Sequence, residues 1–407
     1  MIHTSFCSAL KRSSHGAFYV LYPNRVRQAV SLWKTQLPAV KPFYAVKCNP
    51  DPTFLNLLYD NDIGFDCASE KELLDVQALS REEMTNRIIY ANPCKSVRDL
   101  NAAAQMGSPI TVVDSVEELV KLREINYSGG ALVRIAVPDS GSLMPFSTKF
   151  GLEPDKVEMI ADAAKIIGIP LHGISFHVGS GCLDTKTYKT AIDISVQCAL
   201  KMRASHPAKI IDIGGGFIPD EVDFKAKAMA IRGAIFAAKA KGEFDWIAEP
   251  GRFFASNSFD FFVQVIAKRV ASSGGYHYTI DDSLYGQFSS ILFDHAEPKW
   301  VRVRESGGDR IRDAKPGVLF GKTCDSVDVI ARGSMEELKV GDWLWFPHMG
   351  AYTRATASEF NGFPKPGVVL ADRNSDMRVD WSEDDMRLAA PTGLKYMPTV
   401  TARAFWG

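Results

Sequence analysis

The sequence predicts a parallel (β/α)₈ barrel followed by a mostly β part. Between residues 40 and 255, a short β-branched or aromatic run, a polar turn and a longer segment with helical spacing recur eight times. After residue 252 the pattern changes to apolar and polar alternation punctuated by Gly and Pro. Eight such units fit the usual barrel length of about 250 residues. An open doubly wound sheet is the alternative architecture for the same units.

The eight expected strands are short and apolar enough for a parallel sheet that is covered on both faces. In chain order they are 42–47, 63–67, 87–91, 110–114, 131–136, 173–178, 209–213 and 245–249. The segments between them carry helix signals. Ser115 precedes two acidic residues that suit the first turn of a helix, and 153–167 has apolar residues at i, i+3 and i+4 spacing.

The region after the eighth unit is expected to consist mainly of strands. These are 262–270, 317–320, 327–331, 343–346 and 367–370. A further run at 17–22 precedes the first barrel helix, at 25–37, so this strand can join the second part. We therefore expect a barrel domain at 23–255 and a β-sandwich or β-barrel domain at 256–407, completed by the N-terminal strand within 1–22.

Composition excludes several classes of function. The 407 residues include 47 Lys and Arg against 48 Asp and Glu, a net charge of -1. Without a basic run, nucleic acid and anionic membrane surfaces are not expected partners. No apolar stretch approaches the ~20 residues that cross a bilayer, and no signal-peptide pattern opens the chain. The seven cysteines form no CxxC pair, so we expect no metal site, no disulfide framework and a reducing, cytoplasmic location.

Polar residues stand at the ends of the expected barrel strands, where (β/α)₈ enzymes build their active sites. From the first strand to the eighth they are Lys47, Asp66, Asn92, Asp114, Arg134, His177, the glycines 214–216, and Glu249 with Arg252. A single polar residue at a strand end often has only a structural role. A polar group or a glycine turn at every one of the eight strand ends indicates an active site.

Three of these groups together point to one cofactor. Lys47 ends an apolar run, and burial would lower the pKa of its amine, as a Schiff-base lysine requires. The glycines at 214–216, with Gly251 and Arg252, offer backbone N–H groups and a cation to a phosphate. Glu249 can keep a pyridine nitrogen protonated. An amine, a phosphate cradle and a carboxylate are what pyridoxal 5′-phosphate (PLP) requires of a protein.

Seven segments carry a resemblance to a known family. They are PFYAVKCN (42–49), GFDCAS (64–69), SFHVGSGC (175–182), DIGGGF (212–217), AEPGR (248–252), CDSVD (324–328) and FPHMGAYT (346–353). In this order they resemble motifs of the fold-type III PLP-dependent decarboxylases, which have an alanine racemase-like barrel. The resemblance implies PLP-dependent decarboxylation of a basic L-amino acid.

The resemblance also implies roles for the matching residues. Lys47 would carry PLP as a Schiff base, the catalytic His177 would stack on its ring, and Glu249 would pair with the pyridine nitrogen. The other expected cofactor contacts are Ser180, Gly214, Gly215, Gly216, Gly251, Arg252 and Tyr352, with Asp66 and Arg134 near the lysine. Cys324 would protonate the α-carbon after carbon dioxide leaves. In this family Cys324 and Asp325 come from a second subunit, which implies a head-to-tail homodimer with shared active sites.

Within the family, the ornithine branch is the most similar. Asp294 and Asp325 can grip a distal ammonium, and Phe293, Tyr285 and Phe360 are the other expected substrate contacts. The expected reaction converts L-ornithine to putrescine and carbon dioxide, in polyamine biosynthesis. Lysine or arginine decarboxylation, or dual lysine and ornithine activity, is an alternative because one methylene gives only about 1–3 kcal/mol of discrimination. A non-catalytic relative of the antizyme-inhibitor kind is a third, but it should lack the lysine, the cysteine or the phosphate contacts.

Overall fold

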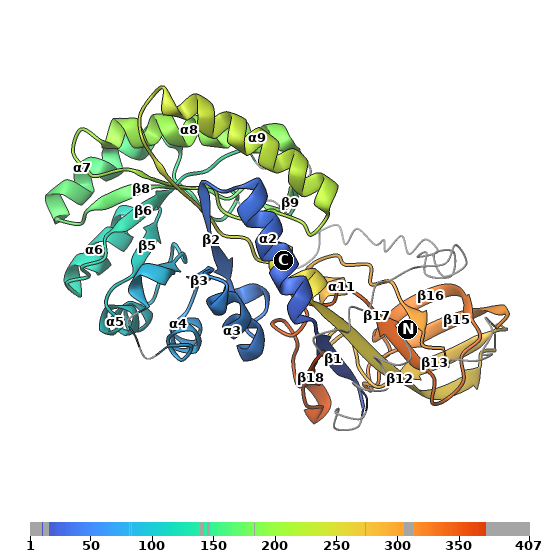
Figure 1. Cartoon of the computed structure of the whole chain (residues 1–407). Helices are drawn as coiled ribbons and strands as arrows, with labels where there is room; N and C mark the ends of the chain where they lie inside the picture. The colour runs from blue at the N-terminus through green and yellow to red at the C-terminus, as the bar shows by residue number, and fades with distance from the viewer. Residues whose placement is uncertain are drawn as a thin grey trace, which may run out of the picture.

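The computed structural model of the chain describes Leu10 and residues 16–371, apart from 81, 83, 139–141, 145–146, 183, 273 and 305–311. Its first part is a closed barrel of eight parallel strands (Figure 1). Around the barrel they are β2 (Val40–Ala45), β3 (Gly64–Cys67), β4 (Ile88–Tyr90), β5 (Ile110–Val113), β6 (Ala131–Arg134), β8 (Leu171–Ser175), β10 (Ile210–Asp212) and β11 (Asp245–Ala248). The predicted barrel is confirmed, and pairing of β11 with β2 excludes the open doubly wound sheet.

Helices connect the barrel strands and surround the barrel (Figure 1). They are α2 (Pro23–Gln36), α3 (Pro52–Asp60), α4 (Glu70–Gln77), α5 (Val97–Gln105), α6 (Val116–Glu124), α7 (Val157–Ile167), α8 (Thr185–Met202) and α9 (Glu221–Lys239), with α10 (Arg252–Ala255) after β11. Local sequence sets several helix starts. Asp51 accepts hydrogen bonds from the N–H groups of Thr53 and Phe54, and Ser115 accepts one from Glu118 at the predicted start of α6.

An aromatic cluster fixes the loops after the seventh and eighth barrel strands. Trp33, fully buried on α2, has its ring centroid 5.0 Å from that of Phe217 and 5.4 Å from that of Phe224. Phe253 and Phe254, on α10, lie 5.5 and 5.8 Å from the same ring. The cluster therefore holds the glycine loop and the start of α10, two segments that carry predicted phosphate contacts.

The second part is a mixed eight-stranded sheet beside the barrel (Figure 1). Its strands are β1 (Phe18–Leu21), β12 (Phe259–Val270), β13 (Tyr276–Ile280), β14 (Val301–Arg302), β15 (Ala314–Phe320), β16 (Val329–Glu336), β17 (Trp343–Phe346) and β18 (Gly367–Leu370). The smaller elements are the pair β7 (Ser142–Met144) and β9 (Ser180–Cys182), and α11 (Ser290–Phe293). The sequence patterns missed β13, which mixes aromatic and polar residues, and the two-residue β14. The ends of the expected second domain, at 372–407 and over most of 1–15, lie outside the described residues.

The N-terminal strand and the loop after β17 help to join the sheet to the barrel. As predicted, β1 joins the second part, because it pairs antiparallel with β12 and parallel with β18. The loop after β17 is pinned beside the first barrel strand. The Nδ2 of Asn49 donates to the carbonyl of Gly350 at 2.9 Å, and the N–H of Tyr352 donates to the carbonyl of Cys48 at 3.0 Å. This places Tyr352 at the mouth of the barrel.

Candidate active site

Lys47 lies just beyond the first barrel strand, in the single 3₁₀ turn Val46–Cys48, because β2 ends at Ala45. The expected strand therefore ran two residues too far. The Lys47 amine is 2.6 Å from the Oδ2 atom of the buried Asp66, on β3. Burial lowers the pKa of Lys47, but the charges of Asp66 and Glu249 outweigh it and hold this pKa above its usual value. The expectation of a depressed lysine pKa is wrong, because carboxylates from two other strands hold the amine as an ammonium.

Two buried carboxylates lie at adjacent strand ends. Glu249 follows β11, and Asp212, at the end of β10, accepts hydrogen bonds from the Ser175 hydroxyl and the Gly214 N–H, both at 2.9 Å. Burial and repulsion from Asp212 raise the pKa of Glu249 well above its ordinary value, and burial raises that of Asp212 to about 6. The Oε1 atom of Glu249 is buried with no hydrogen-bond partner in the structure. The pair therefore binds a proton readily and presents an unused polar atom.

Asp212 is a site residue that the sequence analysis did not single out. Its signal was present in the DIGGGF segment, where a carboxylate ends the seventh barrel strand two residues before the first glycine. The chain position alone does not show that this carboxylate faces Glu249, which ends the neighbouring strand.

His177 lies in the loop after β8, because that strand ends at Ser175 rather than at the expected residue 178. Its Nδ1 accepts a hydrogen bond from the N–H of Gly179 at 2.9 Å. Burial, with the positive charges of Arg134 and Lys47, lowers the pKa of His177 well below its ordinary value. The ring is therefore a neutral imidazole.

The glycine loop after β10 is packed too closely for side chains. Gly214 and Gly216 have φ values of 62° and 97°, in the left-handed region. A Cβ at Gly216 would lie 2.8 Å from the carbonyl oxygen of Gly179, and one at Gly215 would lie 2.8 Å from the Nε2 of His177. The loop can bring its backbone close to a ligand only because these positions are glycines.

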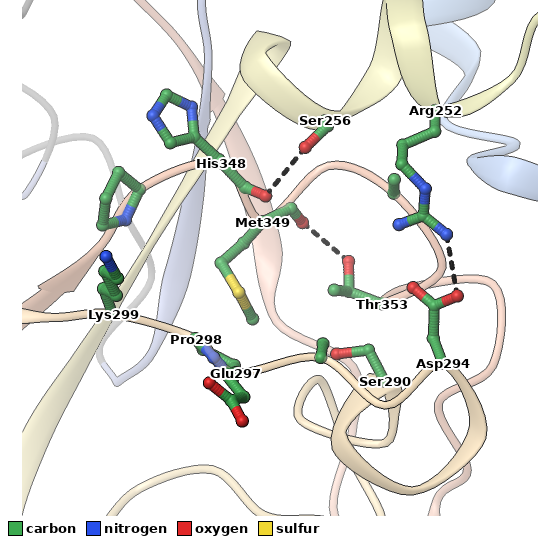
Figure 2. Close-up of a pocket in the computed structure, with 13 residues that line it drawn as sticks. Arg252, Ser256, Ser290, Asp294, Glu297, Pro298, Lys299, His348, Met349 and Thr353 are labelled. Atoms are coloured by element: carbon green, nitrogen blue, oxygen red, sulfur yellow. Dashed lines mark hydrogen bonds and ion pairs between the residues drawn. The ribbon is translucent and has the colours of Figure 1, made fainter. Parts of the chain in front are cut away.

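Arg252, the first residue of α10, joins the phosphate side of the site to the substrate side. Its Nη2 lies 3.3 Å from the Ser180 hydroxyl. The same atom donates to the Oδ1 of Asp294 at 2.7 Å (Figure 2). Its guanidinium also lies 4.9 Å from the ring centroid of Tyr352. Asp294, predicted to bind a substrate ammonium, is thus paired in this structure with a predicted phosphate contact. The sequence analysis did not foresee this ion pair.

Most of the predicted residues line one cavity of about 200 Å³. They are Lys47, His177, Ser180, Gly215, Gly216, Glu249, Gly251, Arg252, Phe293, Asp294 and Tyr352. Asp66 does not line this cavity but is hydrogen-bonded to Lys47, which does. The guanidinium of Arg134, at the end of β6, lies over the ring of Phe150. A second cavity, of about 490 Å³, adjoins the first because Arg252 and Asp294 line both (Figure 2).

Four of the predicted residues, which are Cys324, Asp325, Tyr285 and Phe360, form a separate group on the second part of the chain. The Tyr285 hydroxyl donates to the Oδ2 of Asp325, and the Tyr285 ring stacks on Phe360 with centroids 4.3 Å apart. Cys324 is exposed and contacts Asn361. None of these residues lines the Lys47 cavity. The sequence analysis predicted no role for Asn361.

The residues around the Lys47 cavity fit PLP. The ammonium of Lys47, the unpartnered Oε1 of Glu249 and the glycine cradle provide an amine, an acid and an anion site in one pocket. Among the described residues, no group of His, Cys, Asp and Glu is arranged to hold a metal ion. Over that part of the chain, no helix combines the length and apolar character needed to cross a membrane.

Comparison with known proteins decides the family. The sequence model of the pyridoxal-dependent decarboxylases, pyridoxal-binding domain, matches residues 24–256. The chain belongs to this family. PLP is therefore the cofactor of this decarboxylase.

Relatives of this decarboxylase include both enzymes and a regulator. The ornithine decarboxylase of Schizosaccharomyces pombe is 40% identical over 366 residues, covering 88% of this chain and 83% of that protein. Antizyme inhibitor 2 of Xenopus laevis is 38% identical over 353 residues, covering 82% of this chain and 76% of that protein.

Solved structures of decarboxylases share the fold. The arginine decarboxylase of Paramecium bursaria Chlorella virus, bound to agmatine, has a TM-score of 0.85 and 34% identity, covering 91% of this chain and all of that chain. The lysine/ornithine decarboxylase of Vibrio vulnificus, complexed with cadaverine, has a TM-score of 0.79 and 29% identity, covering 91% of this chain and 98% of that one.

Proposed function

We propose that this decarboxylase converts L-ornithine to putrescine and carbon dioxide. The observation that carries the proposal is that the Asp294 carboxylate and the Lys47 amine line the same cavity. A basic amino acid whose α-amine occupies the position of the Lys47 amine could therefore extend its distal ammonium toward Asp294. Ornithine decarboxylases at 36–40% identity over most of the chain support ornithine as the substrate.

The residues around the cavity would hold PLP at three points. Lys47 would provide the amine that binds the cofactor, and Asp66, 2.6 Å away, would accept the proton that this ammonium must lose before it can form a bond. Glu249 holds a proton at the pyridine nitrogen, with Asp212 behind it as a second proton-binding carboxylate. PLP, when bound, supplies an electron sink that allows the bond between the α-carbon and the carboxylate to break.

The other cavity residues position the ring and its phosphate. His177, as a neutral imidazole, offers a flat face for ring stacking without adding a positive charge. Arg252, Ser180 and the loop of Gly214 to Gly216 would bind the phosphate, and the aromatic cluster around Trp33 keeps that loop in place. By fixing the cofactor, these residues would set the orientation in which a bound substrate reacts.

We further propose that the active form is a homodimer in which each subunit completes its neighbour's site. The thiol of Cys324 hands its proton to the α-carbon, and Asp325 adds a second carboxylate for the distal ammonium. The supporting observation is that Cys324, Asp325 and Phe360 lie outside the Lys47 cavity of their own chain. A head-to-tail pairing of two copies would bring the two groups together.

The expected domain limits and location remain part of this proposal. The barrel domain would span 23–255, and the β domain would span 256–407 with the strand from 1–22. A cytoplasmic location suits the six described cysteines, which are all free thiols.

Two alternatives deserve direct comparison with ornithine decarboxylation. Lysine or arginine decarboxylation is supported by the similar folds of an arginine decarboxylase and a lysine/ornithine decarboxylase. A regulatory role is suggested by similarity to an antizyme inhibitor. The presence of Lys47, Cys324 and Arg252 together argues for an enzyme instead.

A product assay tests the proposal. PLP-loaded protein is incubated separately with ornithine, lysine, arginine and diaminopimelate, and the amine is identified by mass spectrometry. We expect putrescine from ornithine at the highest rate, and no amine from a Lys47→Ala variant. If cadaverine or agmatine is released faster than putrescine, lysine or arginine is the preferred substrate instead of ornithine. The absence of any amine would support the regulatory alternative.

A further inference from the structure

We propose that Asn361 is a positioning residue for Cys324 and that its side-chain amide orients the thiol and faces the sulfur during proton transfer. The inference rests on the proposed role of Cys324 as the proton donor to the α-carbon. Asn361 lies in the short 3₁₀ turn Phe360–Gly362, 37 positions after the cysteine in the chain.

The side-chain amide of Asn361 contacts Cys324 at both ends. The backbone N–H of Cys324 donates to Oδ1 at 3.3 Å, and Nδ2 donates to Sγ at 3.6 Å. A backbone N–H can only donate, so the amide oxygen must face it. The amide NH₂ group is therefore directed at the sulfur, and the two contacts together fix both side chains.

The backbone at Asn361 supports this arrangement. Its φ of 59° and ψ of 13° are left-handed, a conformation in which Asn is enriched among residues other than Gly. Gly362, the next residue, is also left-handed, with φ of 74°. This tight turn brings a short amide side chain back to Cys324, and most other residues would strain it.

The amide donor has a chemical consequence for the reaction. When the thiol delivers its proton, the S–H bond breaks, a C–H bond forms at the substrate's α-carbon, and the sulfur is left as a thiolate. A hydrogen bond from Nδ2 of Asn361 to the sulfur stabilises this anion. A proton from water restores the thiol after the product leaves.

The other ionisable groups around Cys324 stay the same when Asn361 is changed. Asp325 and Asp328 belong to the same segment as the cysteine, and Tyr285 comes from the segment after β13. Lys322 lies over the ring of Phe363, 4.5 Å from its centroid. A change in the thiol of Asn361→Gly, which adds no charge, can therefore be assigned to the lost amide, whereas Asn361→Asp combines this loss with the repulsion of a new carboxylate.

Two substitutions distinguish the effect of the Asn361 amide donor from the effect of the left-handed turn that carries it. Asn361→Asp keeps an oxygen for the Cys324 N–H but replaces the NH₂ donor by a carboxylate oxygen. Asn361→Gly keeps the left-handed backbone and removes both contacts. The matched controls are Asn126→Asp and Asn126→Gly. Asn126 is also exposed and left-handed, with φ of 56°, but it lies in the barrel, in the turn between α6 and β6.

The first measurement is the pH profile of Cys324 alkylation by iodoacetamide in the holoenzyme, followed on the Cys324 peptide by mass spectrometry. For Asn361→Asp we expect the midpoint to rise by about one pH unit, so that alkylation near neutral pH is about tenfold slower. Asn361→Gly should shift in the same direction by less, and the Asn126 variants should match the wild type. A profile for Asn361→Asp that coincides with the wild type would overturn the proposal.

The second measurement is steady-state decarboxylation of ornithine. For Asn361→Asp we expect kcat to fall about tenfold while KM stays within about twofold, because proton delivery rather than binding is impaired. If Asn361→Asp shifts the alkylation profile but even the wild type releases no amine, the positioning role stands and the proposed function is wrong. Wild-type kcat together with an unshifted profile would retain the function and remove the role of Asn361.

Discussion

The carboxylate of Asp294 lies 2.7 Å from the guanidinium of Arg252, so the expected ligand of the substrate ammonium is paired with the expected ligand of the cofactor phosphate. Replacing Asp294 by Asn removes a charged partner of the substrate. We expect KM for ornithine to rise tenfold or more, because a hydrogen bond to a charged group contributes about 1.5–3 kcal/mol to binding. The affinity for PLP should be kept or increase, because Arg252 loses a competing anion.

Steady-state kinetics and a titration of cofactor-stripped protein with PLP measure the two effects separately. Glu297→Gln is the control, because Glu297 is an exposed carboxylate on the same segment, three residues away. Weaker PLP binding in Asp294→Asn than in this control would contradict the expected competition.

The glycine cradle predicts a loss of cofactor affinity in Gly216→Ala. A methyl group there would meet the Gly179 carbonyl at 2.8 Å, and the left-handed backbone adds strain of about 1–2 kcal/mol. We expect the dissociation constant for PLP to rise at least about tenfold. Gly168→Ala is the matched control, since Gly168 is also left-handed, at the end of α7, but nothing lies within 4 Å of its added Cβ. If both variants change PLP affinity equally, the cradle is not the cause.

Mixing two inactive variants tests the shared active site. Lys47→Ala and Cys324→Ala should each lose at least about 100-fold in rate, because one lacks the cofactor amine and the other the proton donor. When subunits exchange at random, half of the dimers are mixed and each mixed dimer has one intact site. Activity should then recover to about a quarter of wild type. No recovery after demonstrated exchange would place both residues in a site within one chain. Cys94→Ala, at another exposed cysteine, should stay active.

Asp282 predicts a pH dependence of stability. It is 3% exposed, it accepts hydrogen bonds from the N–H groups of Ser283 and Gln287, and burial raises its pKa to about 7. The unfolded value is about 4, so the folded protein binds an extra proton between these two pH values. This contribution to stability is complete below about pH 4 and is lost as pH rises to 7, at about 1.4 kcal/mol per pH unit.

Denaturant unfolding between pH 5 and 8 measures this contribution. Asp282→Asn should have a shallower decline in unfolding free energy than the wild type, because its side chain does not titrate. Asp162→Asn, at an exposed aspartate on α7, should follow the wild-type curve. Equal slopes for Asp282→Asn and the wild type would show that Asp282 is already ionised throughout this range.

The barrel and its cofactor residues were predictable because their signals are local. A buried parallel strand needs a short apolar run, and the site residues then fall where each run ends. The ion pair between Arg252 and Asp294 and the contact between Asn361 and Cys324 were not predictable, because each depends on the distance between separate segments. The pKa of Lys47 was predicted in the wrong direction because its own strand shows burial but not the facing carboxylates of Asp66 and Glu249. The alternation of apolar and polar residues predicted most strands of the second part. It did not predict β13, in which aromatic and polar residues are mixed, or the two-residue β14.

The position of β1 in the sheet determines when the sheet can form during synthesis of the chain. Phe18 pairs with Phe262, so β1 has no partner until the entire barrel, which lies between these two residues in the chain, has been made. Its four buried residues must stay out of contact with other chains during that time, which is a period of exposure to aggregation. A slow step in biogenesis is therefore expected at the closure of the sheet around β1, after the barrel has already formed.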